Sequence, residues 1–573
     1  MKTRKLLFLL SALCAATSAM ADGRGGIRLN QVGYLPGQEK VIVLDDFTPK
    51  KVVVKNKVGR IVARPVVKRS AVSPFTGKTR HILDVSDIRQ PGVYTIDVDG
   101  NTEKFEVKNA ALHGLAQASI KAFYLMRSGM AIEKQYAGQF ARPLGHPDTL
   151  VLVHPSAASS GRPEGTVISS PLGWYDAGDY NKYIVNSAFT IAQMLAVYEQ
   201  IPQYFASLDL NIPESGNGVP DLLDEIMYNL KWMLTMQDPT DGGVYHKLTT
   251  PNFEGFVAPT ECHQPRYVVM KSVTASLDFA AVMAQAAKIY ENGYSCPCFP
   301  KKAIAAAKAA YQWAKEHPNA FYRQSVMNQN FKPQVSTGEY GDGNARDEWF
   351  WAATQLYLAT GEKAYLDDAV QNAPERFITP VWGQVSGLGV YAWLNSSKSD
   401  MREKCLNWLA DFAEEATAKV ETSNFQSPFG DEARNFGWGC LAESFCAPGI
   451  ALLYADKYVA PGKYRADALR AADYVLGRNA LGYCYVTGFG KKSPMSPHQR
   501  ISASDGIVAP MPGLLVGGPN PGQQDKASNL NYLSDAPDES YLDDTASYAS
   551  NEIAINWNAC LVGLMCWLDD LMR

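Results

Sequence analysis

The sequence of 573 residues lacks the features that would place it in several common classes of protein. After the N-terminal segment, no stretch reaches the ~18 uninterrupted apolar residues that a membrane-spanning helix needs. The formal net charge is −4, and no basic stripe alternates with aromatic residues, which argues against a nucleic-acid binder. The ten cysteines do not repeat C-x-x-C at zinc-site spacing, so we expect mainly buried free thiols.

The N-terminal segment has the pattern of a secretion signal. A basic start (residues 1–5) precedes the apolar run LLFLLSALCAA, and an A-x-A motif follows at residues 19–21. We therefore expect a signal peptide over residues 1–21 and an exported protein, periplasmic or extracellular. Leu13 fits poorly in front of a lipidated Cys14, so we expect no lipid anchor.

The residues that follow the signal predict a small all-β domain over residues 22–108. They contain short β-branched runs such as VIVLDD, KVVVKN and HILDVSDI, separated by Gly, Pro and Asn-Lys turns. Regularly spaced short strands of this kind are typical of a β-sandwich. The segment PGVYTIDVDGNTEKFEV predicts a hairpin that is closed by Asp99-Gly100.

The hydrophobic period becomes helical from about Leu112, so residues 109–573 predict an all-α domain of about a dozen helices. Several of these helices are apolar nearly all round, which favours a closed ring of helical hairpins over a solenoid. Four long connections are rich in Gly, Pro and aromatic residues and are expected to build a site at one end of the ring. The expected helices cover residues 111–130, 186–205, 220–237, 272–290, 302–317, 346–361, 363–373, 401–419, 447–458, 465–477 and 551–572, and the connections are 138–180, 239–268, 424–440 and 484–547.

Two aspartates in the segment GWYDAGDYNKY (residues 173–183) are the first candidates for chemistry. Asp176 and Asp179 stand just before an expected helix, where they could cap that helix or bind calcium. Alternatively, one of them is the base of a glycoside hydrolase. That reaction needs a second carboxyl group, which gives its proton to the leaving oxygen.

Glu552 is the candidate for that second carboxyl group, and we expect it to begin the last helix. A surface glutamate at a helix start is ordinary, but here the aromatic residues Tyr541, Tyr548 and Trp557 are close in sequence. Aromatic faces stack on sugars, and apolar surroundings raise the pKa of a carboxyl group so that it keeps its proton. His498, Arg500 and His246 lie in loops, where they are either structural or donors to sugar hydroxyls.

Taken together, these segments resemble glycoside hydrolase family nine, the inverting β-glucanases that include many cellulases. The segment LNQVGYLP (residues 29–36) is similar to the start of the immunoglobulin-like domain that precedes some of these catalytic domains. The matching positions in the last hundred residues are Val486, Thr487, Gly490, Lys492, Pro497, His498, Arg500, Tyr541, Asp543, Tyr548, Glu552, Ala554, Asn558 and Ala559.

The resemblance implies a fold and a set of roles. It implies an immunoglobulin-like sandwich followed by an (α/α)6 barrel, with Asp179 as general base, Asp176 helping to position the attacking water and Glu552 as general acid. An inverting enzyme leaves room for water between its carboxyl groups, roughly 6.5–9.5 Å apart. His498 and Asp543 are grouped with the catalytic residues, and the implied substrate contacts are His246, Arg500, Tyr548, Trp557 and Trp174.

The resemblance also implies partners and leaves alternatives. The substrate is a β-1,4-glucan such as cellulose-like, mixed-linkage or xyloglucan polymer; no cofactor takes part in the chemistry, and we expect a monomer. Calcium is a structural ion in the family, whereas Gly145-His146 replaces a frequent Cys-His pair and makes zinc doubtful. The alternatives are an exo-acting cellodextrinase or β-glucosidase and a non-catalytic glycan-binding protein. The oxygen donors considered for calcium are Glu214, Asp221, Asp342 and Asp347.

Overall fold

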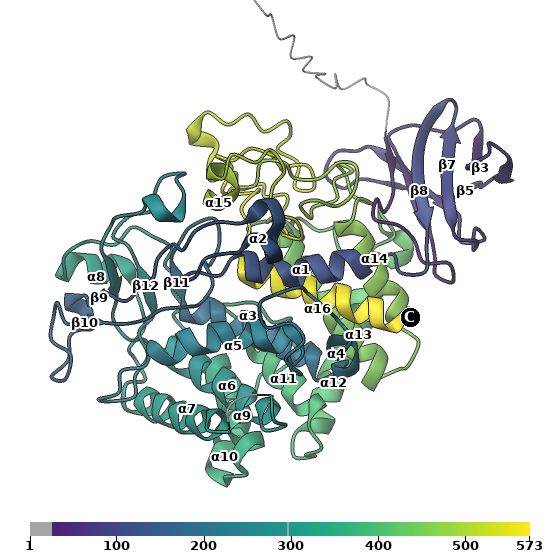
Figure 1. Cartoon of the computed structure of the whole chain (residues 1–573). Coiled ribbons are helices and arrows are strands. Elements are labelled where there is room, and N and C mark those ends of the chain that lie inside the picture. Colours follow the sequence, from purple (N-terminus) through teal and green to yellow (C-terminus); the bar gives the residue numbers. More distant parts are fainter. Residues whose placement is uncertain (1–25, 295–296) are drawn as a thin grey trace, which may run out of the picture.

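The computed structural model describes residues 26–294 and 297–573, so the expected signal peptide lies outside the described residues. A β-sandwich stands at one side of a larger helical body (Figure 1). Within the described part of the chain, no helix combines the length and the apolar character needed to cross a membrane.

The β-sandwich consists of two four-stranded antiparallel sheets, with strand orders β1-β2-β6-β5 and β4-β3-β7-β8. The predicted hairpin is present, because β7 pairs with β8 and the two turn residues Asp99 and Gly100 have φ of 52° and 92°, as a two-residue type I′ turn requires. The all-β prediction is therefore confirmed. The strands are β1 (Ile27–Arg28), β2 (Val41–Asp45), β3 (Val52–Asn56), β4 (Ile61–Ala63), β5 (Val67–Val72), β6 (Thr79–Asp84), β7 (Gly92–Val98) and β8 (Asn101–Val107).

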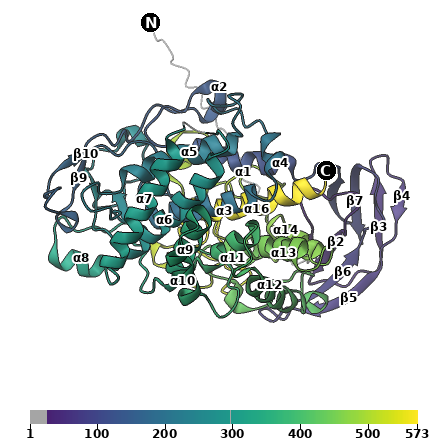
Figure 2. The ribbon, with the colours of Figure 1, turned by 90° about the horizontal axis from the view of Figure 1, so that it is seen from below.

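The helical body is a ring of helix pairs in which an outer helix alternates with an inner one along the chain. The inner helices are buried almost all round, as the sequence predicted for a ring, and they gather at the centre of the body in Figure 2. The rings of Tyr391 and Tyr454 stack at 4.0 Å and join two neighbouring inner helices. The inner helices are α3 (Ile184–Tyr198), α6 (Val273–Tyr290), α9 (Arg346–Thr360), α11 (Ser386–Asn395), α13 (Ala447–Tyr458) and α16 (Ile555–Leu571).

The outer helices expose one face to solvent. They are α1 (His113–Leu125), α5 (Asp221–Thr235), α7 (Phe299–Glu316), α10 (Lys363–Asn372), α12 (Arg402–Thr417) and α14 (Arg465–Val475). Short helices lie in the connections: α2 (Lys134–Ala137), α4 (Pro202–Ala206), α8 (Gln324–Asn330), α15 (Arg500–Ser504) and the π-helix η6 (Ala442–Cys446). The two sets of long helices together form the predicted (α/α)6 arrangement.

One inner helix, α11, was not among the expected helices. Its sequence SGLGVYAWLN contains two glycines, which lower helix propensity by roughly 1 kcal/mol each relative to alanine. Packing explains both, because a Cβ at Gly389 would lie 2.5 Å from the ring of Phe350 in α9 and a Cβ at Gly387 would lie 2.5 Å from the carbonyl oxygen of Ile378. Tertiary contact therefore determines this helix, and the periodicity of so short a segment does not reveal it.

A small sheet inside the helical body is a second difference from the expectation of almost no strands. Its order is β10-β9-β13-β12-β11, and each strand has only two or three residues, too few for a recognisable alternation. β11 begins three residues after Asp179 and pairs with β12. This pairing fixes residues 173–183, which we name the base segment, to the 239–268 connection. The strands are β9 (Val151–Val153), β10 (Val167–Ile168), β11 (Lys182–Tyr183), β12 (Lys247–Thr249) and β13 (Arg266–Val268).

The cysteines largely follow the prediction of free thiols. Seven described cysteines are free, and six of them are buried, while Cys262 is partly exposed. Cys298 is the exception, because it is disulfide-bonded.

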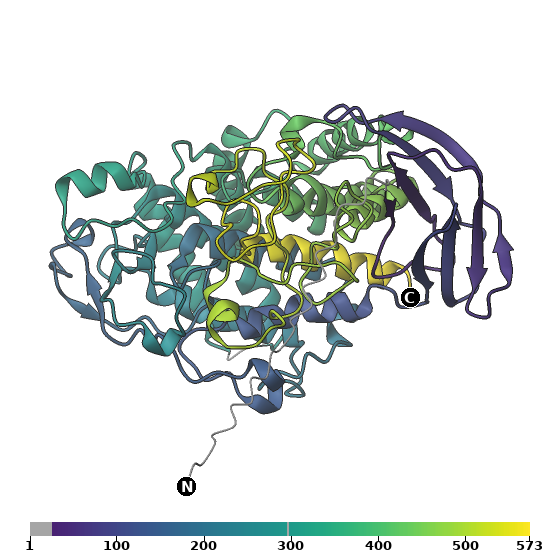
Figure 3. The same cartoon turned by 90° about the horizontal axis from the view of Figure 1, so that it is seen from above.

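The long connections gather at one end of the ring. Residues 484–547, together with α15, lie above the helical body in Figure 1, and Figure 3 looks down on them. Inner helices α3 and α16 begin beneath this layer at Ile184 and Ile555. The end of the ring that carries these loops is therefore the place to look for a site.

Candidate active site

A cavity of about 730 Å³ opens among these loops and the starts of the inner helices. It brings together three of the four carboxyl groups that the sequence singled out as catalytic, Asp176, Asp179 and Glu552, along with a set of aromatic side chains. The lining residues are Asp176, Ala177, Asp179, Tyr183, Phe253, Ser336, Thr337, Gly338, Glu339, Tyr340, Trp382, Trp438, Glu443, His498, Arg500, Tyr548, Glu552, Asn556 and Trp557.

Asp179 is held by hydrogen bonds to one of its two carboxylate oxygens. Asn181 Nδ2 and the Tyr183 hydroxyl, at 3.2 Å, both donate to Oδ2. Oδ1 has no hydrogen-bond partner among the described residues, and the side chain lines the cavity. Asp179 therefore has one anchored oxygen and one oxygen available to a molecule in the cavity.

Asp176 is buried beside Asp179 and is fixed from two sides. Asn186 Nδ2, at the start of α3, donates to Oδ1 at 2.7 Å, and the Tyr340 hydroxyl donates to Oδ2 at 2.7 Å. Burial, and then the charge of Asp179, raise the pKa of Asp176 to about 8. Asp176 therefore keeps its proton at neutral pH.

The sequence predicted that Glu552 begins the last helix, and this prediction is wrong, because α16 begins at Ile555. Glu552 lies in an extended segment before α16 and forms a parallel β-bridge with His498. The backbone N–H of Gly178 donates to Glu552 Oε1 at 3.2 Å, which places the acid against the base segment. A side chain at Gly178 would not fit, because its Cβ would lie 2.3 Å from the carbonyl oxygen of His498 and 3.0 Å from Glu552 Oε1.

Glu552 is protonated at neutral pH, as a general acid must be. Desolvation of its partly buried carboxyl group, and then the charge of Asp179, raise the pKa of Glu552 to about 8. The Gly178 N–H and the Arg500 charge act in the opposite direction but do not cancel the rise. At neutral pH Glu552 therefore holds a proton that it can donate.

His498 and Arg500 complete the wall next to Glu552. His498 Nδ1 lies 2.7 Å from the carbonyl oxygen of Thr545 and must donate to it. Burial lowers the pKa of His498 to about 4, so the ring is neutral and Nε2 is a hydrogen-bond acceptor. Arg500 Nη1 donates to the carbonyl oxygen of Gly178 at 2.8 Å, which ties the short helix α15 to the base segment.

Comparison with known proteins agrees with this geometry. Residues 113–565 match the family described as Glycosyl hydrolase family 9, and residues 23–103 match the Cellulase N-terminal ig-like domain. The chain belongs to glycosyl hydrolase family 9. It is therefore a glycoside hydrolase, which confirms the enzyme class and the family that the sequence resemblance indicated.

The relatives extend the match to nearly the whole chain. The chain is 50% identical over 574 residues to the Xyloglucan-specific endo-beta-1,4-glucanase of Bacteroides ovatus, covering 98% of this chain and 96% of that protein. It is 33% identical over 550 residues to Endoglucanase D of Acetivibrio thermocellus, with 94% and 82% covered. A solved structure described as Bacteroides ovatus GH9 superimposes with a TM-score of 0.91 at 50% identity, covering 96% of this chain and 99% of that one.

Three residues that the family resemblance placed in contact with substrate or with the catalytic group do not line the cavity. Trp174 is fully buried, and its Nε1 donates to Glu225 at 2.7 Å. His246 is fully buried, and its Nε2 donates to the carbonyl oxygen of Glu339 at 2.9 Å. Asp543 accepts the backbone N–H groups of residues 495 and 496, just before His498. All three therefore hold loops in place and do not face the substrate space.

His246 and its neighbour Lys247 show how this support reaches the site. Lys247 Nζ donates to the carbonyl oxygen of Gly338 at 2.6 Å, next to the bond that His246 makes with Glu339. These two bonds fix the segment that presents Tyr340 to Asp176. Burial lowers the pKa of Lys247 to about 7 despite the nearby charge of Asp179.

Several cavity residues were not among the sequence candidates. Tyr340 lies in the connection between α8 and α9, where the sequence analysis singled out no aromatic residue. Trp382 and Glu443 come from connections with no distinguishing pattern, and burial raises the pKa of Glu443 to about 7. Trp438 lies in one of the long connections, where its aromatic character was the available clue.

The residues considered for metals do not form a metal site. In the described ranges no cluster of three or more His, Cys, Asp or Glu side chains is arranged to hold an ion. The carboxylate of Glu214 already pairs with Arg127 at 3.0 Å, and Asp221 accepts the backbone N–H of Leu210 at 2.7 Å. Asp342 lies just before α9 and Asp347 lies in its first turn, and each accepts a backbone N–H.

The position that would carry a zinc-binding cysteine is closed as well. A Cβ at Gly145 would lie 2.3 Å from the Cβ of Pro259, so the backbone leaves no room for a thiolate there. His146 is buried, and its Nδ1 lies 2.9 Å from the Tyr175 hydroxyl. These residues do not fit zinc.

Proposed function

We propose that this enzyme cleaves internal β-1,4 bonds of a xyloglucan-type polymer, with Asp179 as general base and Glu552 as general acid. The observation that carries the proposal is that both carboxyl groups line one cavity, where burial and the charge of Asp179 raise the pKa of Glu552 to about 8. The chain is an endo-β-1,4-glucanase of an inverting family. The preference for xyloglucan is proposed from the 50% identical relative that carries this specificity in its name.

The reaction is a single displacement at the anomeric carbon. Glu552 donates its proton to the glycosidic oxygen as the bond from that oxygen to C1 breaks. Asp179 takes a proton from a water molecule, whose oxygen attacks C1 from the opposite face. The products are a chain with a new free hydroxyl group and a chain whose new reducing end has the inverted, α configuration.

Asp176 and Tyr340 set the position of the water. The Tyr340 hydroxyl donates to Asp176 Oδ2, so the proton that Asp176 carries can be directed towards the cavity beside Asp179. A protonated carboxyl group is a hydrogen-bond donor as well as an acceptor. We propose that it orients the attacking water without competing with Asp179 for the water's proton.

Aromatic side chains supply the sugar contacts. Trp382, Trp438, Tyr548 and Trp557 line the cavity, and the rings of Trp438 and Tyr548 lie 5.8 Å apart. Apolar faces of aromatic rings stack on the C–H faces of glucose units. We propose that these rings, with Arg500 and the Nε2 acceptor of His498, bind the glucan chain across the cleavage point.

Two further properties are part of the proposal. Export to the periplasm or the cell exterior is proposed from the leader pattern in residues 1–21, which suits an enzyme that meets a polymer outside the cytoplasm. Action as a monomer is proposed from the family resemblance of the sequence. No cofactor takes part in the chemistry.

A product time course tests the function. Purified enzyme is given xyloglucan, mixed-linkage glucan, carboxymethyl cellulose and cellohexaose, with the Glu552→Gln variant as a control. A rapid fall in viscosity with products of mixed length, fastest on xyloglucan, is expected. Release of glucose or cellobiose alone, at unchanged viscosity, would show an exo-acting enzyme, and binding without hydrolysis would show a glycan-binding protein.

A further inference from the structure

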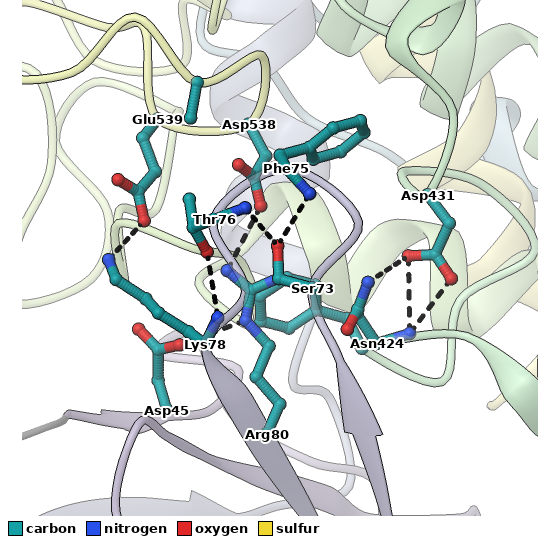
Figure 4. Close-up of polar contacts among 12 residues, drawn as sticks. Asp45, Ser73, Phe75, Thr76, Lys78, Arg80, Asn424, Asp431, Asp538 and Glu539 are labelled. Carbon is teal, nitrogen blue, oxygen red and sulfur yellow. Dashed lines mark hydrogen bonds and ion pairs between the residues drawn. The ribbon is translucent and has the colours of Figure 1, made fainter.

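The β-sandwich contacts two of the loops that line the cavity. We name residues 424–440 the tryptophan loop, because it presents Trp438, and residues 517–551 the acid loop, because it presents Tyr548 and leads into Glu552. The side chains between the sandwich and these loops are shown in Figure 4. The sandwich therefore does not line the cavity itself, but it contacts two loops that do.

Arg80, on strand β6, is the central side chain of this contact, and it is only 1% exposed. Its Nε donates to Asp45 of the sandwich at 3.0 Å, and its Nη2 donates to Asp538 of the acid loop at 3.1 Å. Its guanidinium carbon also lies 4.3 Å from the centre of the Phe425 ring in the tryptophan loop. One side chain thus touches the sandwich and both loops.

The charged side chains that meet at Arg80 are buried, because those of Asp45 and Asp538 are also at most 4% exposed. Burial alone would lower the pKa of Arg80, but the carboxylates of Asp538 and Asp45 raise it, so the guanidinium keeps its charge. The side chain of Asp538 has no exposed surface. Removal of the arginine would leave a buried carboxyl group without its cation, and such a group tends to rearrange or to take up a proton.

Weaker contacts surround Arg80 at the same interface. Lys78 pairs with Glu539 of the acid loop, and Phe75 meets Phe436 of the tryptophan loop edge to face at 5.7 Å. Lys78 is about a third exposed, so its ion pair is screened by solvent and contributes little. It offers a matched comparison for the buried arginine.

Hydrogen bonds carry this anchoring from Asp538 to the cavity. Two residues after Asp538, the carbonyl oxygen of Ser540 accepts the backbone N–H of Asn520 at 2.8 Å. Asn520 Nδ2 donates to the carbonyl oxygen of Ala549 at 2.9 Å, next to Tyr548. A displacement of Asp538 would therefore be passed on to the Tyr548 ring.

We propose that Arg80 is a positioning residue that sets the distance between Trp438 and Tyr548, and with it the width of the glucan-binding cavity. The inference rests on the proposed function, because it assigns to these two rings the role of sugar contacts. It assigns the sandwich a part in substrate binding, although none of its residues lines the cavity.

The test measures binding in the Glu552→Gln background, so that no probe is hydrolysed. Dissociation constants are measured by calorimetry for a xyloglucan oligosaccharide with eight backbone glucoses and for cellohexaose. Arg80→Met is expected to raise the Kd about tenfold, and Trp438→Ala to raise it by a similar factor. The double variant is expected to bind hardly more weakly than either single variant, because the lost contact is shared.

The controls separate positioning from stability. Lys78→Met, at the same interface, is expected to change the Kd less than about twofold. If Arg80→Met does not fold, Asp538→Asn takes its place, since it weakens the same contact without changing the residue's size. The thermal midpoint of each variant is recorded beside its Kd.

Two results would overturn the inference. If the two single substitutions raise the Kd by factors that multiply in the double variant, Arg80 does not act through the ring of Trp438. An unchanged Kd in a folded Arg80→Met or Asp538→Asn variant would show the same. Failure of the parent Glu552→Gln enzyme to bind either oligosaccharide would instead refute the proposed function.

Discussion

Replacement of Glu552 by glutamine is predicted to change the pH dependence of stability as well as the activity. The structure raises the pKa of Glu552 from its ordinary value of 4.5 to about 8. Between these values the unfolded chain loses the proton while the folded chain keeps it. Stability that is fully present below pH 4.5 is therefore lost as the pH rises through 8, and at about 1.4 kcal/mol per pKa unit the loss totals about 5 kcal/mol.

The glutamine variant lacks this titration, so its stability should not fall for this reason. Between pH 4.5 and pH 8 the thermal midpoint of the wild type should therefore fall relative to that of the variant. We expect the difference between the two midpoints to change by several degrees in favour of the variant. The control is Glu403→Gln, which changes an exposed glutamate at the start of α12 and should give a difference that does not depend on pH. The measurement is a series of thermal unfolding curves at matched ionic strength.

The same ionisation limits the activity of the wild type. A general acid must hold its proton, so kcat/KM should fall tenfold per pH unit above about pH 8, and Glu552→Gln should lower turnover by about 10²–10⁴. Parallel pH dependence of the midpoints in wild type and variant would refute the reasoning, because it would mean that Glu552 is not held protonated by the fold. Near-normal turnover of the variant would refute its role as the acid.

Three further variants test the other groups. Asp179→Ala should lower turnover by about 10²–10⁴ on xyloglucan, and added azide should restore part of the rate; an unchanged rate would exclude it as base. Tyr340→Phe removes the donor to Asp176 and should lower kcat about ten- to hundredfold with little change in KM, as steady-state kinetics would show. Gly178→Ala should reduce kcat strongly, whereas Gly437→Ala, where a Cβ meets nothing within 4 Å, should not; equal effects would contradict the close packing at residue 178.

The sequence predicted the two-domain fold because both periodicities are strong where elements are long. Strands of five to seven residues and helices of ten or more repeat their pattern often enough to be recognised. The small sheet escaped because its strands have two or three residues, and α11 escaped because glycines 387 and 389 weaken its helical pattern. In both cases contacts between distant segments, which no local pattern records, decide the structure.

The candidate site shows the same limit at the level of side chains. The carboxyl groups of Asp179 and Glu552 lie in segments with distinctive patterns, and the structure places both in the cavity. The orientation of His246 could not be predicted, because its burial depends on the backbone of Glu339, 93 residues away. Glu443 could not be predicted either, since it enters the cavity from a π-helix with no recognisable motif.

The arrangement of protons explains how three neighbouring carboxyl groups can share one desolvated cavity. Each negative charge in a desolvated cavity raises the pKa of the others, and the charge of Asp179 raises those of Asp176 and Glu552. In the proposed reaction Glu552 loses one proton and Asp179 gains one, so the net charge of the cavity is the same before and after cleavage. Exchange of two protons with solvent water, one lost by Asp179 and one gained by Glu552, then restores the starting state.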